Sequence, residues 1–314
     1  MDKMNKTTIT KSHESIKPYI HETPVFTSRL INELIGAEVF FKCENFQKMG
    51  AFKMRGALNA ILNLTEEQRS KGVVTHSSGN FAQALSLSSQ MLGINAYIVM
   101  PSTASQVKKD AVVGYGGNLV ECEPNMVMRE KTAQSIVKDK GATFIHPSND
   151  TDVIVGNATS AKELLERYPE LDYIFTPVGG GGLIAGTALS ALHFGKDCKV
   201  IGGEPAEADD AFRSLKSRKI ETNLTTHTIA DGLKTELGDI NFPIIIDHVE
   251  RIILVSEEEI ISAMRLIWER LKVLAEPSSA VAFAALIKEK QLFQNKKIGI
   301  IISGGNVDLT KVPF

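Results

Sequence analysis

Short apolar runs typical of buried strands alternate with amphipathic helical runs along almost the whole chain. The runs that predict strands are residues 39–43, 73–76, 96–100, 118–122, 143–146, 173–177, 199–204 and 297–302. Helices are predicted after Lys53 and over residues 81–92, 106–115, 126–140, 153–168 and 183–194, and one more has a face of Ile260, Met264, Ile267, Leu271 and Leu274. This alternation is typical of βαβ units, so we predict an α/β fold with mostly parallel sheets.

The same alternation is also compatible with a single eight-stranded barrel. We prefer two open sheets flanked by helices, because 314 residues suggest about two domains and the glycine-rich loops are spread along the chain. The clearest break in the pattern is the Pro-Ser-Asn-Asp stretch at residues 147–150.

Composition and charge exclude several classes of protein. Hydrophobic residues make up 43% of the chain, which is typical of a globular protein. A net charge of −2 provides no basic surplus for nucleic acid, and no apolar run reaches the ~18 residues that a membrane span needs. The polar first residues do not resemble a signal peptide. Cys43, Cys122 and Cys198 are widely spaced, so we expect reduced thiols in a cytoplasmic protein.

Lys53 has a sequence context that an ordinary surface lysine does not need. Phe52 precedes it, and an amphipathic helical pattern follows it. Apolar neighbours and the positive end of a helix both disfavour the ammonium form, so the pKa of Lys53 should be lowered. Lysines with a lowered pKa commonly form Schiff bases. The simpler alternative is a surface lysine beside a phenylalanine.

Three loops rich in glycine and serine follow predicted strands. Residues 176–183 contain four consecutive glycines before a helix, an arrangement that favours phosphate binding. Residues 77–80 suit a carboxylate, although serine and asparagine are also ordinary helix caps. Residues 302–306 follow the last predicted strand. Because ligands bind at the carboxyl ends of parallel strands, these loops could converge on one crevice.

Two weaker signals concern other ligands. Gly180, Gly182, Ala185 and Glu204 fit a dinucleotide-binding pattern, which short glycine runs often satisfy by chance. The acidic run at residues 204–210 could bind a hard cation such as Mg²⁺, but such runs are usually solvated loops. His76, His146 and His193 lack metal-ligand spacing, and a structural role suits the two that flank strand ends, His76 and His146, better.

Several longer motifs together resemble one enzyme family. ENFQKMGAFKMRGA, HSSGNFAQAL, PVGGGGLIAG, EPAEADDA, ADGLK, AEPSSA and SGGNVDL occur in the order found in the serine racemase and serine/threonine dehydratase family. These are pyridoxal-phosphate enzymes of the tryptophan-synthase β-like fold, known as fold type II. The resemblance covers nearly the whole chain. Because the chain stops soon after residue 309, we expect the short catabolic type without a regulatory tail.

The resemblance implies a domain arrangement and a set of site residues. A large domain of residues 1–65 and 150–314 would bind the cofactor, a small domain would span residues 66–149, and the active site would lie between them. The implied cofactor-binding residues are Phe52, Lys53, Asn80, Gly179, Gly180, Gly181, Gly182, Leu183, Gly232, Glu276 and Ser303. The implied substrate-binding residues are Ser78, Gly79, Asn80 and Phe81. Glu204, the Ala208 carbonyl and Asp210 match the family's divalent-cation site, which reverses the weaker interpretation above.

By the same resemblance, Lys53 forms the aldimine with the cofactor and then takes the substrate's Cα proton. Serine, threonine or 3-hydroxyaspartate would lose its β-hydroxyl and yield a 2-oxo acid and ammonia. The alternative is racemisation, with Ser78 on the face opposite Lys53. Less favoured alternatives are an NAD-dependent oxidoreductase and a non-catalytic binding module. The family also implies a homodimer.

This chain departs from the family pattern at three places. Phe81 replaces a common histidine, Met49 and Ala51 interrupt the KTGSFK pattern, and Asn157 and Ala158 replace the Gln and Gly of GQGT. We hypothesise that Phe81 shifts substrate choice away from serine toward a β-substituted hydroxyamino acid.

Overall fold

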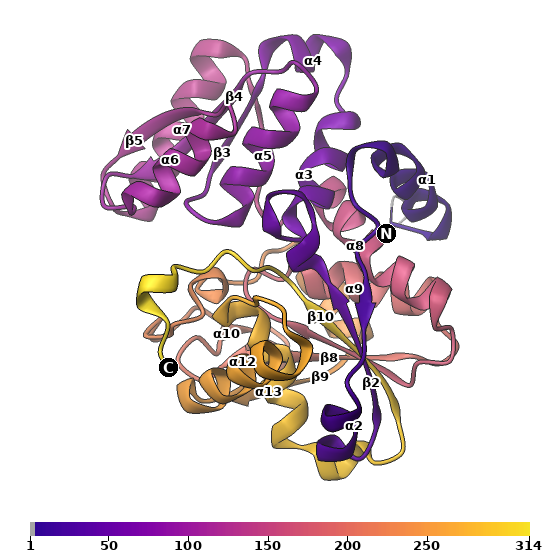
Figure 1. Ribbon diagram of the computed structural model, residues 1–314. Helices are drawn as coiled ribbons and strands as arrows, with labels where there is room; N and C mark the ends of the chain where they lie inside the picture. The colour runs from indigo at the N-terminus through magenta and orange to yellow at the C-terminus, as the bar shows by residue number, and fades with distance from the viewer. Residues whose placement is uncertain (1–3) are drawn as a thin grey trace.

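The computed structural model describes residues 4–314 and contains two separate sheets (Figure 1). A six-stranded sheet has the order β1-β2-β10-β7-β8-β9 and is parallel except for β1, and a four-stranded sheet has the order β5-β4-β3-β6 and is wholly parallel. The strands are β1 Val25–Phe26, β2 Glu38–Cys43, β3 Val73–His76, β4 Ala96–Pro101, β5 Asn118–Cys122, β6 Thr143–Phe144, β7 Tyr173–Pro177, β8 Lys199–Pro205, β9 Val249–Val255 and β10 Lys297–Ile302.

Helices cover both faces of each sheet. They are α1 Lys6–Ile16, α2 Arg29–Ile35, α3 Lys53–Leu62, α4 Glu66–Lys71, α5 Asn80–Met91, α6 Gln106–Gly114, α7 Met126–Lys140, α8 Thr151–Arg167, α9 Gly182–Phe194, α10 Asp210–Ser217, α11 Phe242–His248, α12 Glu257–Leu271 and α13 Pro277–Lys288. Short 3₁₀ helices span Lys17–Tyr19, Glu44–Phe46, Lys48–Gly50, Asp231–Leu233, Lys290–Phe293 and Leu309–Lys311. Among residues 4–314, no helix is both long and apolar enough to cross a bilayer.

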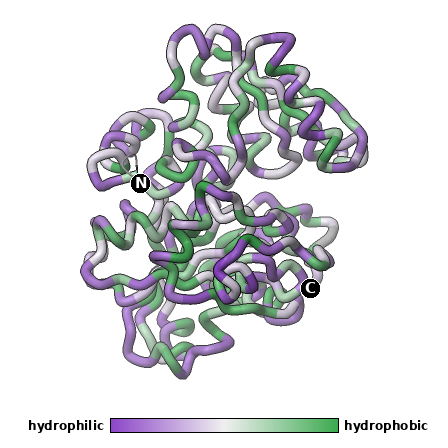
Figure 2. The backbone as a smooth tube through the Cα atoms, turned by 180° about the vertical axis from the view of Figure 1, so that it is seen from behind, coloured by the Kyte–Doolittle hydropathy of each residue, from purple (hydrophilic) through white to green (hydrophobic). Residues whose placement is uncertain are grey.

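The central strands β3, β7 and β10 are buried on both faces, as expected for parallel sheets between helices. Because successive strand residues point to opposite faces, Ile300 of β10 packs in the cluster with α12 and α13, whereas Ile301 packs with α8. Val73 and Val74 of β3 divide in the same way between the α5 side and the α7 side. Figure 2 shows hydrophobic and hydrophilic stretches alternating along the backbone, with hydrophilic stretches along much of the periphery.

The predicted α/β class with two open sheets is confirmed, and the barrel alternative is wrong. Two predicted boundaries are also wrong. The strand predicted to residue 146 ends at Phe144, because His146 Nδ1 accepts hydrogen bonds from the Ser148 and Asn149 amides and turns the chain. Leu274 lies outside α12, which ends where Lys272 adopts a left-handed conformation with φ +60°.

Helix α8 packs closely against both α3 and α9. A Cβ atom on Gly156 of α8 would lie 2.6 Å from the Arg55 carbonyl of α3, so these helices touch backbone to backbone. A Cβ atom on Gly186 of α9 would lie 2.8 Å from the Ile154 carbonyl of α8. Lys53 begins α3 and the four-glycine loop begins α9, so α8 fixes their relative positions.

Candidate active site

Lys53 begins α3, and its side chain is half-buried. The preceding residue is anchored to the loop after β10, since the Phe52 amide donates to the Ser303 carbonyl at 2.9 Å. Lys53 Nζ donates to the Pro147 carbonyl at 2.7 Å. Burial lowers the pKa of Lys53 to about 8. The neutral amine, which is the form that acts as nucleophile or base, is therefore accessible near physiological pH.

Two aromatic rings lie close to this amine. Lys53 Nζ is 5.0 Å from the ring centroid of Phe52 and 5.6 Å from that of Phe81. Cation–π attraction to the rings stabilises the charged ammonium form. The rings also displace water, and the hydration that the ammonium loses outweighs this attraction. The net result is the lowered pKa. Phe81 is almost completely buried on α5, where the family pattern commonly places a histidine.

The four glycines form a close-fitting cradle at the start of α9. Gly181 has φ +79°, a conformation that favours glycine. A Cβ atom on Gly182 would lie 2.8 Å from the Ser148 carbonyl, and one on Gly179 would lie 2.8 Å from Leu233 Cα. Because the first amides of a helix lack partners within it, those of Gly182 and Leu183 are available to an anion. The cradle therefore fits a phosphate group.

The turn at residues 147–149 lies between Lys53 and the glycine cradle. The Pro147 carbonyl accepts from Lys53, and Ser148 Oγ would lie only 2.5 Å from a Cβ atom on Gly180. The sequence analysis treated this stretch only as a breakpoint. The available signal for a role in the site was the pair Ser148 and Asn149 directly after a predicted strand. Serine and asparagine also occur at ordinary turns, so this signal was not specific.

Residues 77–80 do not cap α5 with their side chains. Gly79 is the N-cap residue, and the Asn80 side chain instead donates to Glu276 at 2.9 and 3.2 Å. Burial raises the pKa of Glu276 to about 7. Ser78 and Gly79 remain partly exposed, with open space where a Gly79 side chain would lie. The helix N-terminus here is consequently open to a carboxylate.

Ser303 and Gly232 both contact the start of α13. The Ser303 hydroxyl is 2.9 Å from the Ser279 hydroxyl and is almost fully buried. The Gly232 amide donates to Ser278 Oγ at 3.0 Å, and a Cβ atom on Gly179 would lie 3.1 Å from the Gly232 carbonyl. The structure therefore places Gly232 directly beside the cradle.

Glu204 and Asp210 form a fully buried pair of carboxylates. Burial and the charge of Asp210 raise the pKa of Glu204 well above its usual value, and burial raises that of Asp210 to about 6. Asp210 Oδ1 has no hydrogen-bond partner among the described residues. Within residues 4–314 no three His, Cys, Asp or Glu side chains gather to hold a metal ion. Two carboxylates with the buried Ala208 carbonyl nonetheless suit a hard cation.

A family model described as "Pyridoxal-phosphate dependent enzyme" matches residues 16–304. The chain belongs to this family. It is 48% identical over 303 residues to a beta-hydroxyaspartate dehydratase of Paracoccus denitrificans, covering 96% of each chain. It is 44% identical to an L-threo-3-hydroxyaspartate ammonia-lyase of Saccharomyces cerevisiae, covering 94% of this chain and 91% of that one. The crystal structure of serine racemase from Dictyostelium discoideum matches with a TM-score of 0.93, at 48% identity, over 97% and 99% of the two chains.

In a pyridoxal-phosphate dependent enzyme, the cradle and the buried amine have complementary uses. The cradle fits the anionic end of the cofactor, and Lys53 fits its aldehyde. The dinucleotide interpretation fails because the family is now known and because Glu204, which it needs for a ribose, is fully buried. Both Glu204 carboxylate oxygens also accept amides of α10, from Ala211 at 2.9 Å and Phe212 at 2.8 Å.

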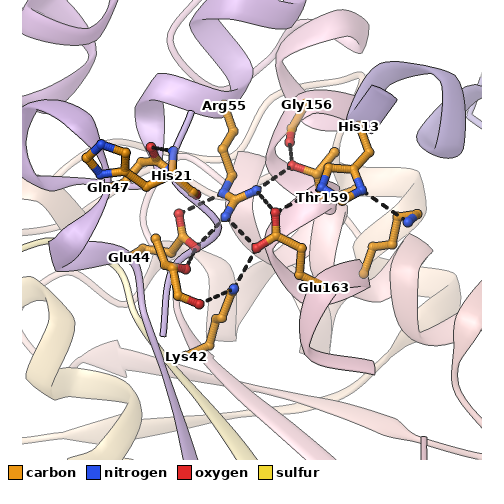
Figure 3. A network of polar contacts seen from close by, with 12 residues as sticks. His13, His21, Lys42, Glu44, Gln47, Arg55, Gly156, Thr159 and Glu163 are labelled. Carbon is orange, nitrogen blue, oxygen red and sulfur yellow. Dashed lines mark hydrogen bonds and ion pairs between the residues drawn. The ribbon is translucent and has the colours of Figure 1, made fainter. Parts of the chain in front are cut away.

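A buried charge cluster surrounds Arg55, which follows Lys53 by two residues on α3 (Figure 3). Arg55 donates to both oxygens of Glu44, at 2.7 and 2.9 Å, and to both oxygens of Glu163, at 2.7 and 2.8 Å. Glu163 also accepts from Lys42 at 2.6 Å and contacts His13 at 2.9 Å. The cluster ties α3 to α1, α8 and β2. The sequence analysis missed it, because its members are up to 150 residues apart.

His76 and His146 stack edge to face with centroids 5.8 Å apart. Burial lowers the pKa of both imidazoles, and the charges of His76 and Lys53 help to lower that of His146 to about 4. His146 is therefore neutral and acts as a hydrogen-bond acceptor for the turn that receives Lys53.

The departures from the family pattern also have defined positions. Met49 adopts φ +55°, and its carbonyl accepts from Asn306 at 2.8 Å. Ala51 forms an isolated bridge with the loop after β10. Asn157 donates to the Gly182 carbonyl at 3.3 Å, so it links α8 to the start of α9.

Proposed function

We propose that this chain is a pyridoxal-phosphate-dependent ammonia-lyase that converts a small hydroxyamino acid to a 2-oxo acid and ammonia. The candidate substrates are serine, threonine and 3-hydroxyaspartate. The observation that carries the proposal is the Lys53 amine, whose pKa is lowered by burial and which contacts a turn packed on the glycine cradle. Relatives named for dehydratase and ammonia-lyase activity on hydroxyaspartate, at 44–48% identity, support the same reaction class.

The roles of individual residues follow from their chemistry. When bound, pyridoxal phosphate withdraws electrons from the substrate and makes its Cα–H bond acidic. Neutral Lys53 accepts the Cα proton and, as an ammonium, can return a proton to the departing β-hydroxyl. Ser78 and Gly79, which immediately precede α5, bind the substrate carboxylate at the N-terminus of that helix. Phe52 and Phe81 exclude water from the reacting atoms.

The cofactor would be held by residues from both ends of the site. The cradle from Gly179 to Leu183 binds the phosphate, and Asn80 orients the ring beside Glu276. Ser303 presents a hydroxyl to the ring nitrogen. A hydroxyl, unlike a carboxylate, does not keep that nitrogen protonated, which favours prompt loss of the β-substituent over transamination.

Serine racemisation is the second candidate activity. It requires a proton donor on the face opposite Lys53, and the partly exposed Ser78 hydroxyl is the candidate. Relatives named serine racemase at 48% identity favour keeping this alternative. Ser78→Ala should abolish formation of D-serine while leaving ammonia release measurable.

The deciding experiment compares two lysine variants. Lys53→Ala should lower the kcat for ammonia and 2-oxo acid release by about 100-fold or more, the usual contribution of a general base. Lys71→Ala is the matched control, because Lys71 forms an exposed ion pair with Glu67 at 2.6 Å and should retain activity. If the purified protein holds cofactor but releases ammonia from none of the three substrates, the proposed activity is wrong.

We further propose a divalent-cation site at Glu204, the Ala208 carbonyl and Asp210. The unpartnered Asp210 Oδ1 and the mutual repulsion of two buried carboxylates support it. A bound cation would satisfy that oxygen and offset the repulsion. Mg²⁺ should therefore raise the melting temperature of the native protein, and Asp210→Asn should remove that effect.

Three broader proposals concern organisation. The four-stranded sheet is built only from strands between residues 73 and 144, which supports a small domain of residues 66–149 and a large domain of residues 1–65 and 150–314.

Phe26 and Phe46 stack edge to face with 37% and 45% of their surfaces exposed, an apolar area that a second copy could cover in a homodimer. Free Cys43, Cys122 and Cys198 support a reducing, cytoplasmic location.

A further inference from the structure

Asn241 is fully buried and links the glycine cradle to the turn at residues 147–149. Its Nδ2 group donates to the Gly180 carbonyl at 2.9 Å and to the Ser148 carbonyl at 3.3 Å. Its Oδ1 atom accepts from the Gly238 amide at 3.1 Å. Both donors and the acceptor of this amide are therefore used. A buried amide with all its partners is well fixed, because losing any one of them leaves an unpaired polar group.

The segment from Leu237 to Asn241 packs directly on the cradle. A Cβ atom on Gly181 would lie 2.6 Å from Asn241 Oδ1 and 2.8 Å from Leu237 Cδ2. The segment also contacts the turn beside Lys53, because the backbone N–H of Asn241 donates to Asn149 Oδ1 at 3.3 Å. A displacement of this segment would therefore displace the amides that face an anion in the cradle.

The other end of the same segment is attached to the buried carboxylate pair. The Leu237 amide donates to Asp210 Oδ2 at 3.1 Å. The opposite oxygen of that carboxylate is the unpartnered Oδ1. Asp210 thus contacts the segment with Oδ2, while Oδ1 has no hydrogen-bond partner among the described residues. Four residues further along, Asn241 contacts the cradle.

We propose that Asn241 is a positioning residue that couples the Glu204–Asp210 cation site to the phosphate cradle. This inference rests on the cofactor and cation sites proposed above. A divalent cation removes the repulsion between the two carboxylates and fixes Asp210 where the Leu237 amide reaches it. The segment is then held against the cradle, and Asn241 keeps Gly180 in the geometry that binds phosphate. By linkage, the cofactor should tighten cation binding by the same factor.

The test measures equilibrium binding of pyridoxal phosphate to cofactor-free full-length protein, with Mg²⁺ and with a chelator. In the native protein, Mg²⁺ should lower the Kd for pyridoxal phosphate by at least about fivefold, the low end of ordinary coupling between sites. Asn241→Ala should raise that Kd by about tenfold, as expected for unpaired buried carbonyls, and should abolish the response to Mg²⁺. Binding of Mg²⁺ itself, measured by calorimetry without cofactor, should persist in Asn241→Ala.

Two further variants separate positioning from general loss of stability. Asn241→Asp has nearly the same shape and keeps an acceptor for the Gly238 amide, but it loses the donor to Gly180 and should behave like Asn241→Ala. Asn32→Ala is the matched control, because Asn32 accepts from the Val39 amide at 3.0 Å between α2 and β2. It should leave the Kd and its response to Mg²⁺ unchanged. Circular dichroism and urea titration report folding in each case.

The proposal is overturned if Asn241→Asp binds pyridoxal phosphate and responds to Mg²⁺ as Asn32→Ala does. It is also overturned if Mg²⁺ leaves the Kd of the native protein unchanged. These outcomes are distinct from failure of the proposed activity, because they need no turnover. A protein that shows the coupling but releases no ammonia would keep this inference and refute the ammonia-lyase assignment.

Discussion

Arg55→Met removes the central cation of the buried cluster in Figure 3 while keeping much of the side-chain volume. The substitution deletes four hydrogen bonds to carboxylates and a fifth to Thr159 Oγ1 at 3.2 Å. Glu163 keeps Lys42 and His13 as partners, but the Glu44 carboxylate keeps, among residues 4–314, only the Thr23 hydroxyl at 2.6 Å. Breaking a buried ion pair from one side costs about 3–5 kcal/mol, because a charge is left without its partner.

We therefore expect Arg55→Met to lower the free energy of unfolding at pH 7 by about 3–5 kcal/mol, a large share of the total of about 5–15 kcal/mol for a typical domain. Urea denaturation followed by circular dichroism measures this loss. Arg29→Met is the matched control, since Arg29 is 80% exposed and pairs with Glu33 on the surface of α2. Exposed pairs contribute about 0–1 kcal/mol.

The pH dependence gives a second test of the same reasoning. Burial alone would raise the pKa of Glu163, but Arg55, His13 and Lys42 together hold it below its usual 4.5. Stability from such a group is present above the unfolded pKa and is lost as pH falls below about 4.5. The difference between native protein and Arg55→Met should therefore narrow in acid. If Arg55→Met costs no more than Arg29→Met at pH 7, the cluster does not depend on the Arg55 charge.

Three other predictions concern the site. Because only the neutral amine is reactive and burial lowers the pKa of Lys53 to about 8, loading of pyridoxal phosphate onto cofactor-free protein should accelerate as pH rises through about 8; a midpoint near 10.5 would contradict the burial argument. Gly182→Ala places a Cβ atom 2.8 Å from a backbone carbonyl, so it should weaken cofactor binding by about tenfold or more, whereas Gly114→Ala, with open space at its Cβ, should not. Phe81→His should raise turnover of serine relative to 3-hydroxyaspartate, and an unchanged ratio would refute the proposed role of Phe81 in substrate choice.

Local pattern predicted much of the fold but missed particular elements for identifiable reasons. The alternation of strands and helices predicted the α/β class, chain length and the spread of the glycine loops favoured two sheets over a barrel, and α3 does begin at Lys53. Helix α13 was not predicted because it is apolar on nearly every face, so it has little helical periodicity to detect. Strand β9 was also missed. It carries charged residues at Glu250 and Arg251 within an apolar run, which obscures a buried-strand signal.

The sequence by itself determined the residues able to do chemistry: an amine beside a phenylalanine, four glycines before a helix, and the carboxylates of one acidic run. Those signals are local, since they depend on neighbours within a few residues. Only the tertiary structure decided which of them meet. Asn241 reaches Gly180 across 61 residues and Ser148 across 93. Such contacts follow from how helices and sheets pack, and no spacing along the chain encodes them.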